Sequence, residues 1–227
     1  KTERSASPHT VRAYMGDLRR YEAYLARKGI GLLGATPVLV KGFLAELSAS
    51  CAEHTRARAL ASIRAFHRFL VRRFGLEKNP AKSVRSPKLP QRLPKALPVD
   101  EIFALMAAPA TDGVLGLRDR AILEVLYGSG VRVSELCGLS LLDVDLVARV
   151  ARVKGKGGKE RLCPLNEAAV LALKAYLARR RECLRKASSR ADPSALFVNA
   201  RGGRLTARSV ARNLDRYVLK CSLQRKV

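Results

Sequence analysis

Two stretches of the chain combine residue types that could act on a phosphate. The first is a run of glycine and basic residues at 154–161, whose cations are Lys154, Lys156, Lys159 and Arg161. Glycines let a tight turn approach another molecule closely, and lysines on such a turn could reach phosphate oxygens. The GxxxxGK(S/T) pattern of nucleotide-binding loops is absent, and a strand rather than a helix is expected to follow. The alternative interpretation is an ordinary solvated basic hairpin.

The second stretch places Arg132 directly after a segment expected to be buried, with Glu135 three residues further along. An arginine suits phosphate because its planar guanidinium donates two parallel hydrogen bonds to two oxygens. Glu135 is near enough in sequence to orient Arg132. An Arg–Glu pair with a purely structural role is the alternative.

Together the two stretches favour a site that binds a scissile phosphate. Arg132 would neutralise the non-bridging oxygens, and a hairpin lysine would protonate the leaving oxygen. Asp143 and Asp145 alone do not make a two-metal site, so we expect neither a metal ion nor another cofactor. Cleavage of a phosphodiester without a metal would require a nucleophile from the protein.

Composition indicates the kind of partner. The 227 residues include 44 Lys and Arg against 19 Asp and Glu, for a formal net charge of +25, and 48% are hydrophobic. The hydrophobic share allows a buried core, and no apolar run reaches the ~18 residues of a membrane span. The parts before and after residue 97 are both basic, so both are expected to face one polyanion. The five cysteines show no CxxC pair, which argues against zinc and fits a reducing cytoplasm.

The elements that would carry these residues divide the chain in three. Residues 1–84 are predicted to be a helical domain, with helices from Pro8 to about Gly29, from Pro37 to about Leu47 and from about Thr55 to Phe74. The third helix carries a basic face, whose candidates for contact with a polyanion (DNA, RNA or an anionic membrane surface) are Arg56, Arg64, Arg68 and Arg72.

Residues 85–97 are predicted to be an extended basic linker. Closely spaced prolines exclude a helix or a central strand there. The linker cations could lie against phosphates, and the candidates are Lys88, Arg92 and Lys95.

Residues 98–227 are predicted to be a mixed α+β domain. Helices are expected at 99–106, 117–127, 131–139, 166–185 and 206–219, and strands at 147–153, 160–165 and 195–198. Arg208 and Arg212, at a four-residue step on the last helix, are further candidates for contact with the polyanion.

Three of these stretches resemble the site-specific tyrosine recombinases, most closely the bacterial Xer type. They are the linker at 79–95, the arginine segment at 117–136 and the lysine hairpin at 153–165; residues 7–14 also look like the start of that family's core-binding helices. The linker is slightly nearer the XerD branch than the XerC branch. The resemblance implies an all-α, SAM-like core-binding domain followed by a catalytic domain with a small β-sheet.

The resemblance also implies roles. Arg132 would be the first catalytic arginine, Lys156 would donate a proton to the leaving 5′ oxygen, and Glu135 would support Arg132. The enzyme would cut double-stranded DNA through a 3′-phosphotyrosine and resolve chromosome dimers at dif-like sites, together with a second Xer recombinase in a tetrameric synapse. Its location would be the bacterial cytoplasm, at the nucleoid.

One departure from the family pattern qualifies this expectation. The family's His-x-x-Arg motif is expected after the last helix, but His9, His54 and His67 all lie in the first domain, far from that position. The sequence context of the family's tyrosine nucleophile is not matched in residues 1–227 either. Tyr217, the last tyrosine, lies in an amphipathic pattern and is not expected to be the nucleophile. We therefore expect a catalytic domain without its C-terminal part, which binds DNA but does not transfer strands by itself.

Three other functions stay open at this point. A phage or mobile-element integrase would share every motif named above. A DNA-binding module that has lost its chemistry would keep the basic surfaces. An RNA-binding protein is the weakest alternative, because it does not explain Arg132 together with the lysine hairpin.

Overall fold

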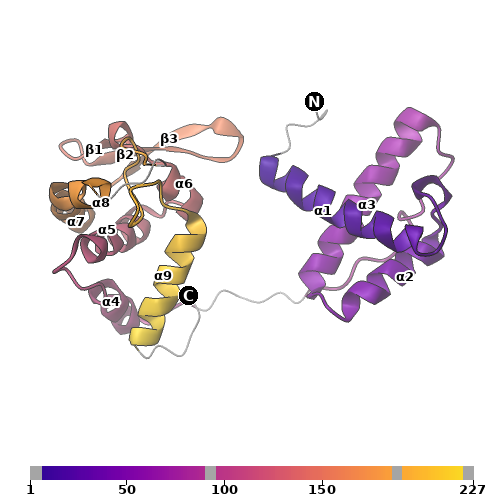
Figure 1. Cartoon of the computed structure of the whole chain (residues 1–227), viewed down its shortest axis with the longest axis horizontal. Helices are drawn as coiled ribbons and strands as arrows, with labels where there is room; N and C mark the ends of the chain where they lie inside the picture. The colour runs from indigo at the N-terminus through magenta and orange to yellow at the C-terminus, as the bar shows by residue number, and fades with distance from the viewer. Residues whose placement is uncertain (1–6, 90–95, 186–190, 222–227) are drawn as a thin grey trace. The chain divides into compact units, whose positions relative to one another are not determined.

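The computed structural model describes residues 7–89, 96–185 and 191–221. The chain forms two compact units, Lys1–Pro94 and Lys95–Val227 (Figure 1). The linker proposed for residues 85–97 stays a prediction, and Arg92 and Lys95 lie outside the described residues. No helix within the described ranges is long and apolar enough to cross a membrane.

The first unit is helical, as predicted. It contains α1 (Pro8–Ala26), a short 3₁₀ turn (Leu32–Gly34), α2 (Pro37–Ser48) and α3 (Glu53–Phe74). The local signals for helix ends act as expected: Ser7 and Thr36 cap α1 and α2 with their hydroxyl oxygens, and Gly75 ends α3 in the left-handed conformation.

Two polar contacts fix the helices of this unit. The buried carboxylate of Asp17 on α1 accepts hydrogen bonds from Arg20 (2.7 Å), from Arg58 on α3 (3.0 Å) and from Ser62 (3.0 Å). The guanidinium of Arg64 on α3 donates to the carbonyl oxygens of residues 81 (3.0 Å) and 84. The chain that follows α3 therefore folds back against that helix.

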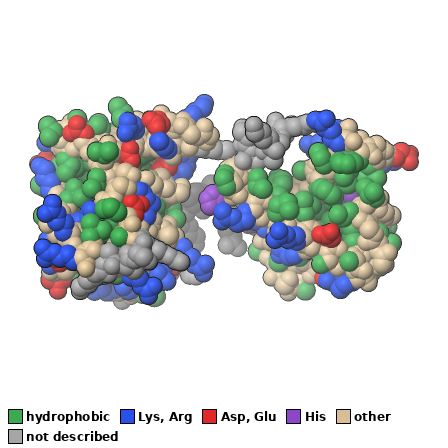
Figure 2. Space-filling model, turned by 45° about the horizontal axis from the view of Figure 1, so that its top comes forward, with side chains coloured by type: hydrophobic (Ala, Val, Ile, Leu, Met, Phe, Trp, Pro, Cys, Tyr) green, Lys and Arg blue, Asp and Glu red, His purple; other side chains and the backbone are tan. Residues whose placement is uncertain are grey.

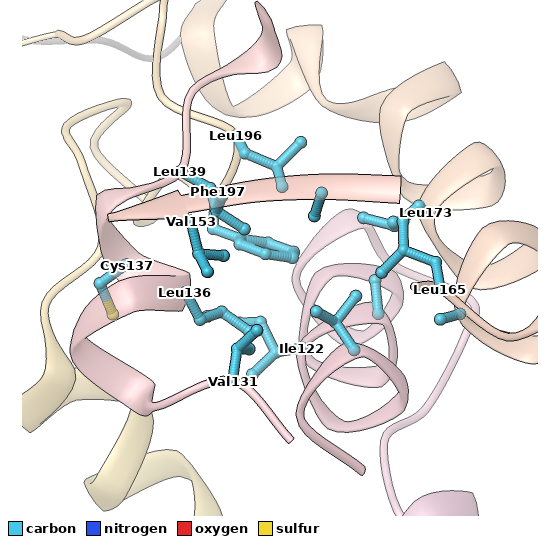
Figure 3. Close-up of a cluster of buried hydrophobic side chains, with 14 of the residues drawn as sticks. Ile122, Val131, Leu136, Cys137, Leu139, Val153, Leu165, Leu173, Leu196 and Phe197 are labelled. Atoms are coloured by element: carbon cyan, nitrogen blue, oxygen red, sulfur yellow. The ribbon is translucent and has the colours of Figure 1, made fainter. Parts of the chain in front are cut away.

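The second unit is built around α5 (Val114–Ser129), which packs against α7 (Glu167–Arg179). Its other helices are α4 (Val99–Ala107), α6 (Val133–Gly138), α8 (Arg181–Arg185) and α9 (Ala207–Lys220). Figure 3 shows the core between these elements, where Ile122, Leu136 and Phe197 meet Val153 of the sheet and Leu173 of α7.

A small antiparallel sheet lies over this core. Its strands are β1 (Val144–Asp145), β2 (Val150–Lys154) and β3 (Glu160–Pro164), in the order β1-β2-β3. The register places residue 153 opposite 161 and residue 154 opposite 160. The β2–β3 hairpin thus carries the basic glycine turn at its tip.

Three predicted elements of this unit differ from the structure, the first of them only in where it begins. Residues 147–149 form a turn, with Arg149 at φ 56°, and the strand begins only at Val150. The helix predicted over 166–185 is two helices, and between them the buried Arg180 donates hydrogen bonds to the carbonyl oxygens of residues 195 and 196. Residues 195–198 make isolated bridges to residues 140 and 204 instead of a strand.

Candidate active site

Arg132 stands at the first turn of α6, where the chain leaves the buried α5. Gly130 ends α5 with φ 61°, a left-handed conformation that favours glycine, and Val131 is buried in the core behind it. Arg132 is then the N-cap of α6, and its side chain is 71% exposed. The sequence thus holds the backbone of this arginine rigidly while its guanidinium faces solvent.

Glu135 organises the site. Its carboxylate is buried and accepts four hydrogen bonds, which match the four lone-pair positions of a carboxylate. Oε2 accepts the backbone N–H of Arg132 (2.9 Å) and Nη2 of Arg161 (2.8 Å), while Oε1 accepts Nη1 of Arg132 (2.9 Å) and Nη1 of Arg161 (3.0 Å). The hydrogen bonds from Arg161 and then those from Arg132 lower the pKa of Glu135 to about 2, against the opposing effect of its burial.

The two arginines differ in how many of their N–H donors remain available to a ligand. Arg161 lies on β3 and spends both terminal nitrogens on Glu135 as a planar fork. Arg132 spends only Nη1 on that carboxylate. The arrangement therefore points most of the Arg132 donors outward, as binding of a phosphate would require.

The predicted pair of Arg132 and Glu135 does meet in the structure, but Arg161 was predicted only as a DNA contact. Its place beside Glu135 was missed because the two residues are 26 positions apart and lie on different elements. The predicted hairpin pairs β2 with β3 and gives no information on a residue of α6, so it did not indicate the contact between Arg161 and Glu135.

The glycines of the basic turn differ in what the structure asks of them: two adopt an unusual backbone conformation, and one lies close to other side chains. Gly157 and Gly158 adopt φ 77° and 76°, which other residues rarely accept. Gly155 lies close to the ion pair, because a Cβ there would be 3.3 Å from Nη1 of Arg161 and 3.4 Å from Oε1 of Glu135, a tight fit that a small shift of the side chains would relieve. The backbone of Lys156 begins this turn, and its side chain lies outside the described part of the structure.

The other candidates for DNA contact divide into exposed and engaged side chains. Figure 2 shows Lys and Arg side chains spread over the visible face of each unit. Seven candidates are exposed: Arg68, Arg72, Lys88, Lys154, Lys159, Arg208 and Arg212. Arg56 is mostly covered and lies 3.7 Å from Glu53, while Arg64 is engaged with backbone carbonyls as described above.

Tyr217 has a structural position. Its hydroxyl donates to Oδ2 of the buried Asp119 (2.8 Å), which also accepts two hydrogen bonds from Arg118. Burial and then the contact with Asp119 raise the pKa of Tyr217. These contacts join α9 to α5, and they account for this tyrosine without a role in chemistry.

Within the described ranges, no group of three or more His, Cys, Asp or Glu side chains could hold a metal ion. The polar groups that the structure gathers beside Arg132 are instead a carboxylate and a second guanidinium. Such a cluster suits an anionic ligand.

Comparison with known protein families shows where this chain belongs. Residues 95–227 match the phage integrase family, and residues 1–74 match the phage integrase N-terminal SAM-like domain. The chain belongs to the phage integrase family. It is a site-specific tyrosine recombinase of the Xer type, a class of enzymes that recombine DNA.

Individual relatives agree with this assignment. The tyrosine recombinase XerC of Myxococcus xanthus is 56% identical over 226 residues, covering 99% of this chain and 75% of that protein. The relative named here is an XerC, so the leaning of the linker toward the XerD branch gains no support.

Solved structures share the fold. The XerH recombinase bound to a palindromic difH substrate aligns with a TM-score of 0.75 at 18% identity, over 99% of this chain and 66% of that one. A lambda integrase tetramer bound to a Holliday junction aligns with a TM-score of 0.72 at 18% identity, over 99% and 61%.

Proposed function

We propose that this recombinase exchanges DNA strands at a dif-like site and resolves chromosome dimers there. Two findings support the proposal: the relative at 56% identity is named XerC, and a solved Xer-type recombinase of the same fold is bound to a difH substrate. We propose a cytoplasmic location at the nucleoid, where such a substrate lies.

The observation that carries the proposal is the exposed Arg132 held by the buried Glu135. In the proposed reaction Arg132 binds the non-bridging oxygens of the scissile phosphate and stabilises the charge that develops on them. A tyrosine hydroxyl, not assigned to a residue of 1–227, loses its proton to solvent as its oxygen forms a bond to phosphorus. As the bond from phosphorus to the 5′ oxygen breaks, Lys156 gives its proton to that oxygen.

The partners follow from the same chemistry. Duplex DNA would contact the cations predicted from the sequence, with the exposed Arg68, Arg72, Lys154, Arg208 and Arg212 ahead of the engaged Arg64. Residues 85–97 would link the two units along the phosphates. A second Xer-type recombinase would complete a tetrameric synapse, as the tetramer of lambda integrase on a Holliday junction suggests.

The first experiment reads the gene past the codon for Val227 and incubates its full product with a nicked dif-like duplex. A covalent protein–DNA adduct is expected, because the phosphotyrosine intermediate accumulates when the broken strand diffuses away. Arg132→Ala should lower the rate of adduct formation on the order of 10²- to 10³-fold, since it removes a donor to the developing charge. The control is Arg152→Ala, which removes an exposed arginine of β2 that pairs with Asp143 (3.2 Å).

Other outcomes would favour the alternatives. Tight DNA binding without any adduct would indicate a DNA-binding module without chemistry. An adduct on other recombination sites but not on dif-like duplexes would indicate a phage or mobile-element integrase. Stronger binding of RNA than of duplex DNA in competition would contradict the recombination function of this site altogether.

A further inference from the structure

Arg161 occupies the one place in the described hairpin where β3 touches the carboxylate that holds Arg132. Both of its terminal nitrogens donate to Glu135, at 3.0 and 2.8 Å, and its side chain keeps 41% exposure. The guanidinium thus uses two of its five N–H donors in a bidentate pair that also neutralises its charge, whereas Arg132 uses one. The main effect of Arg161 in the fold is therefore on what it holds.

What it holds is the base of the basic turn. Residue 161 pairs with residue 153 in the β2–β3 register, one position before the last pair of the hairpin, 154 with 160, and residues 155–159 beyond that pair make up the turn that contains Lys156. The same Glu135 carboxylate binds the backbone N–H and the guanidinium of Arg132. The turn and Arg132 are therefore fixed to one shared group from two sides.

We propose that Arg161 is a positioning residue, which sets the lysine of the β2–β3 turn at the correct distance from the phosphate bound by Arg132. This inference rests on the function proposed above, and it assigns Arg161 a role other than contact with DNA. Without the fork between Arg161 and Glu135, the core contact between β2 and α6 would remain, but the turn end of the hairpin would lose its direct tie to the carboxylate that holds Arg132. Arg132 itself would stay in place, because its two hydrogen bonds to Glu135 do not involve Arg161.

The close approach of Gly155 supports this tie. Its backbone lies so near the Arg161–Glu135 pair that an added Cβ would stand 3.3 Å from Nη1 of Arg161, a tight contact, and would touch Oε1 of Glu135 at 3.4 Å. The glycine thus lets the start of the turn lie directly against the ion pair. A shift of the pair would therefore also shift the start of the turn.

The test uses Arg161→Lys in the full-length recombinase and two nicked duplexes. One duplex has the natural 5′ oxygen at the scissile bond, and in the other sulfur replaces that oxygen. A thiolate leaves without a proton, so its departure does not depend on a general acid. Lysine keeps the charge of Arg161 but lacks the planar fork.

The expected result is a loss that depends on the leaving group. Arg161→Lys should slow cleavage of the oxygen duplex on the order of 10- to 100-fold, which is the effect of a displacement of about 1 Å in a catalytic group. Cleavage of the sulfur duplex should stay within about 3-fold of the wild type, since no proton is needed there. The DNA affinity and its salt dependence should not change, because no phosphate contact is removed.

Gly155→Ala serves as the second variant and should give the same signature with a smaller loss, because it presses on the pair without removing it. Arg152→Lys is the matched control: the same exchange in the same sheet, at an ion pair away from Glu135. Equal losses on both duplexes, no loss at all, or a loss of DNA affinity would overturn the positioning role. A wild-type protein without any adduct would instead contradict the proposed function, so the two failures are distinguishable.

Discussion

Each unit of the molecule holds a buried carboxylate that accepts hydrogen bonds from two arginines, but the two clusters are arranged differently. At Asp17 a single oxygen, Oδ1, accepts from both Arg20 and Arg58, and both arginines are 44% exposed. At Glu135 one arginine is bound by both of its terminal nitrogens, and the other is bound by one and stands 71% exposed.

The difference separates a structural cluster from a candidate site. Asp17 joins α1 to α3, and its second oxygen is taken by Ser62 of α3, so the whole cluster serves the packing of two helices. Glu135 fixes one arginine and presents the other. An unequal division of donors around one carboxylate is what a phosphate-binding arginine needs, because its own donors must stay available.

The largest expected effect contrasts the two carboxylates in catalysis. Glu135→Gln keeps the size of the side chain but replaces an acceptor of four hydrogen bonds by a neutral amide. We expect adduct formation to fall about 100-fold, because a misplaced Arg132 loses transition-state stabilisation. Asp17→Asn should keep the single-turnover rate at saturating DNA within about 3-fold, since its arginines do not act on the phosphate.

Single-turnover assays on the nicked duplex measure both rates. A similar loss in the two variants would show that the unequal arrangement at Glu135 has no special role in catalysis.

The next effect concerns the stability of the fold, where the Asp17 cluster is the one that matters. Asp17→Asn should lower the free energy of unfolding by about 2 kcal/mol, because hydrogen bonds to a charged group joining α1 and α3 are lost. Urea denaturation followed by circular dichroism measures the change. Glu22→Gln, at an exposed position on the same helix, should stay within about 0.5 kcal/mol of the wild type. Equal stabilities for the two variants would mean that Asp17 does not hold the helices together.

The features that the sequence predicted well depend on neighbouring residues. Ser7, Thr36 and Gly75 act at helix ends through contacts a few residues away, and Arg132 meets Glu135 across one turn of helix. Such contacts depend on local geometry alone, so their spacing is visible in the sequence.

The features that were missed depend on segments far apart in the chain. Arg180 interrupts the predicted long helix by reaching carbonyls about fifteen residues later, and Arg64 turns from the expected DNA face to the chain after α3. Arg161 reaches Glu135 in the same long-range way. A pattern of positive charge does not tell which arginines bind backbone carbonyls within the fold and which remain for a polyanion.

The smallest expected effect is a difference between the two units in how their stability depends on pH. His67 on α3 is buried, and burial lowers its pKa from 6.5. The unfolded chain therefore takes up this proton first, so the stability contributed by the neutral imidazole is present above about pH 6.5 and declines as the pH falls below it. Glu135, with its pKa lowered to about 2 from 4.5, contributes stability that is full above pH 4.5 and is lost only between about pH 4.5 and 2.

Between pH 7 and 5 only the first unit should therefore weaken through these two groups, by at most about 1.4 kcal/mol per pH unit for one proton. Urea unfolding of the wild type and His67→Leu at pH 7 and pH 5 measures the difference. The change of the unfolding free energy with pH should be smaller in His67→Leu and nearly the same as wild type in Glu135→Gln, because the Glu135 carboxylate is ionised in the folded state and mostly ionised in the unfolded state at pH 5 and above. A slope that persists in His67→Leu would mean that another group of the first unit sets the acid sensitivity of the chain.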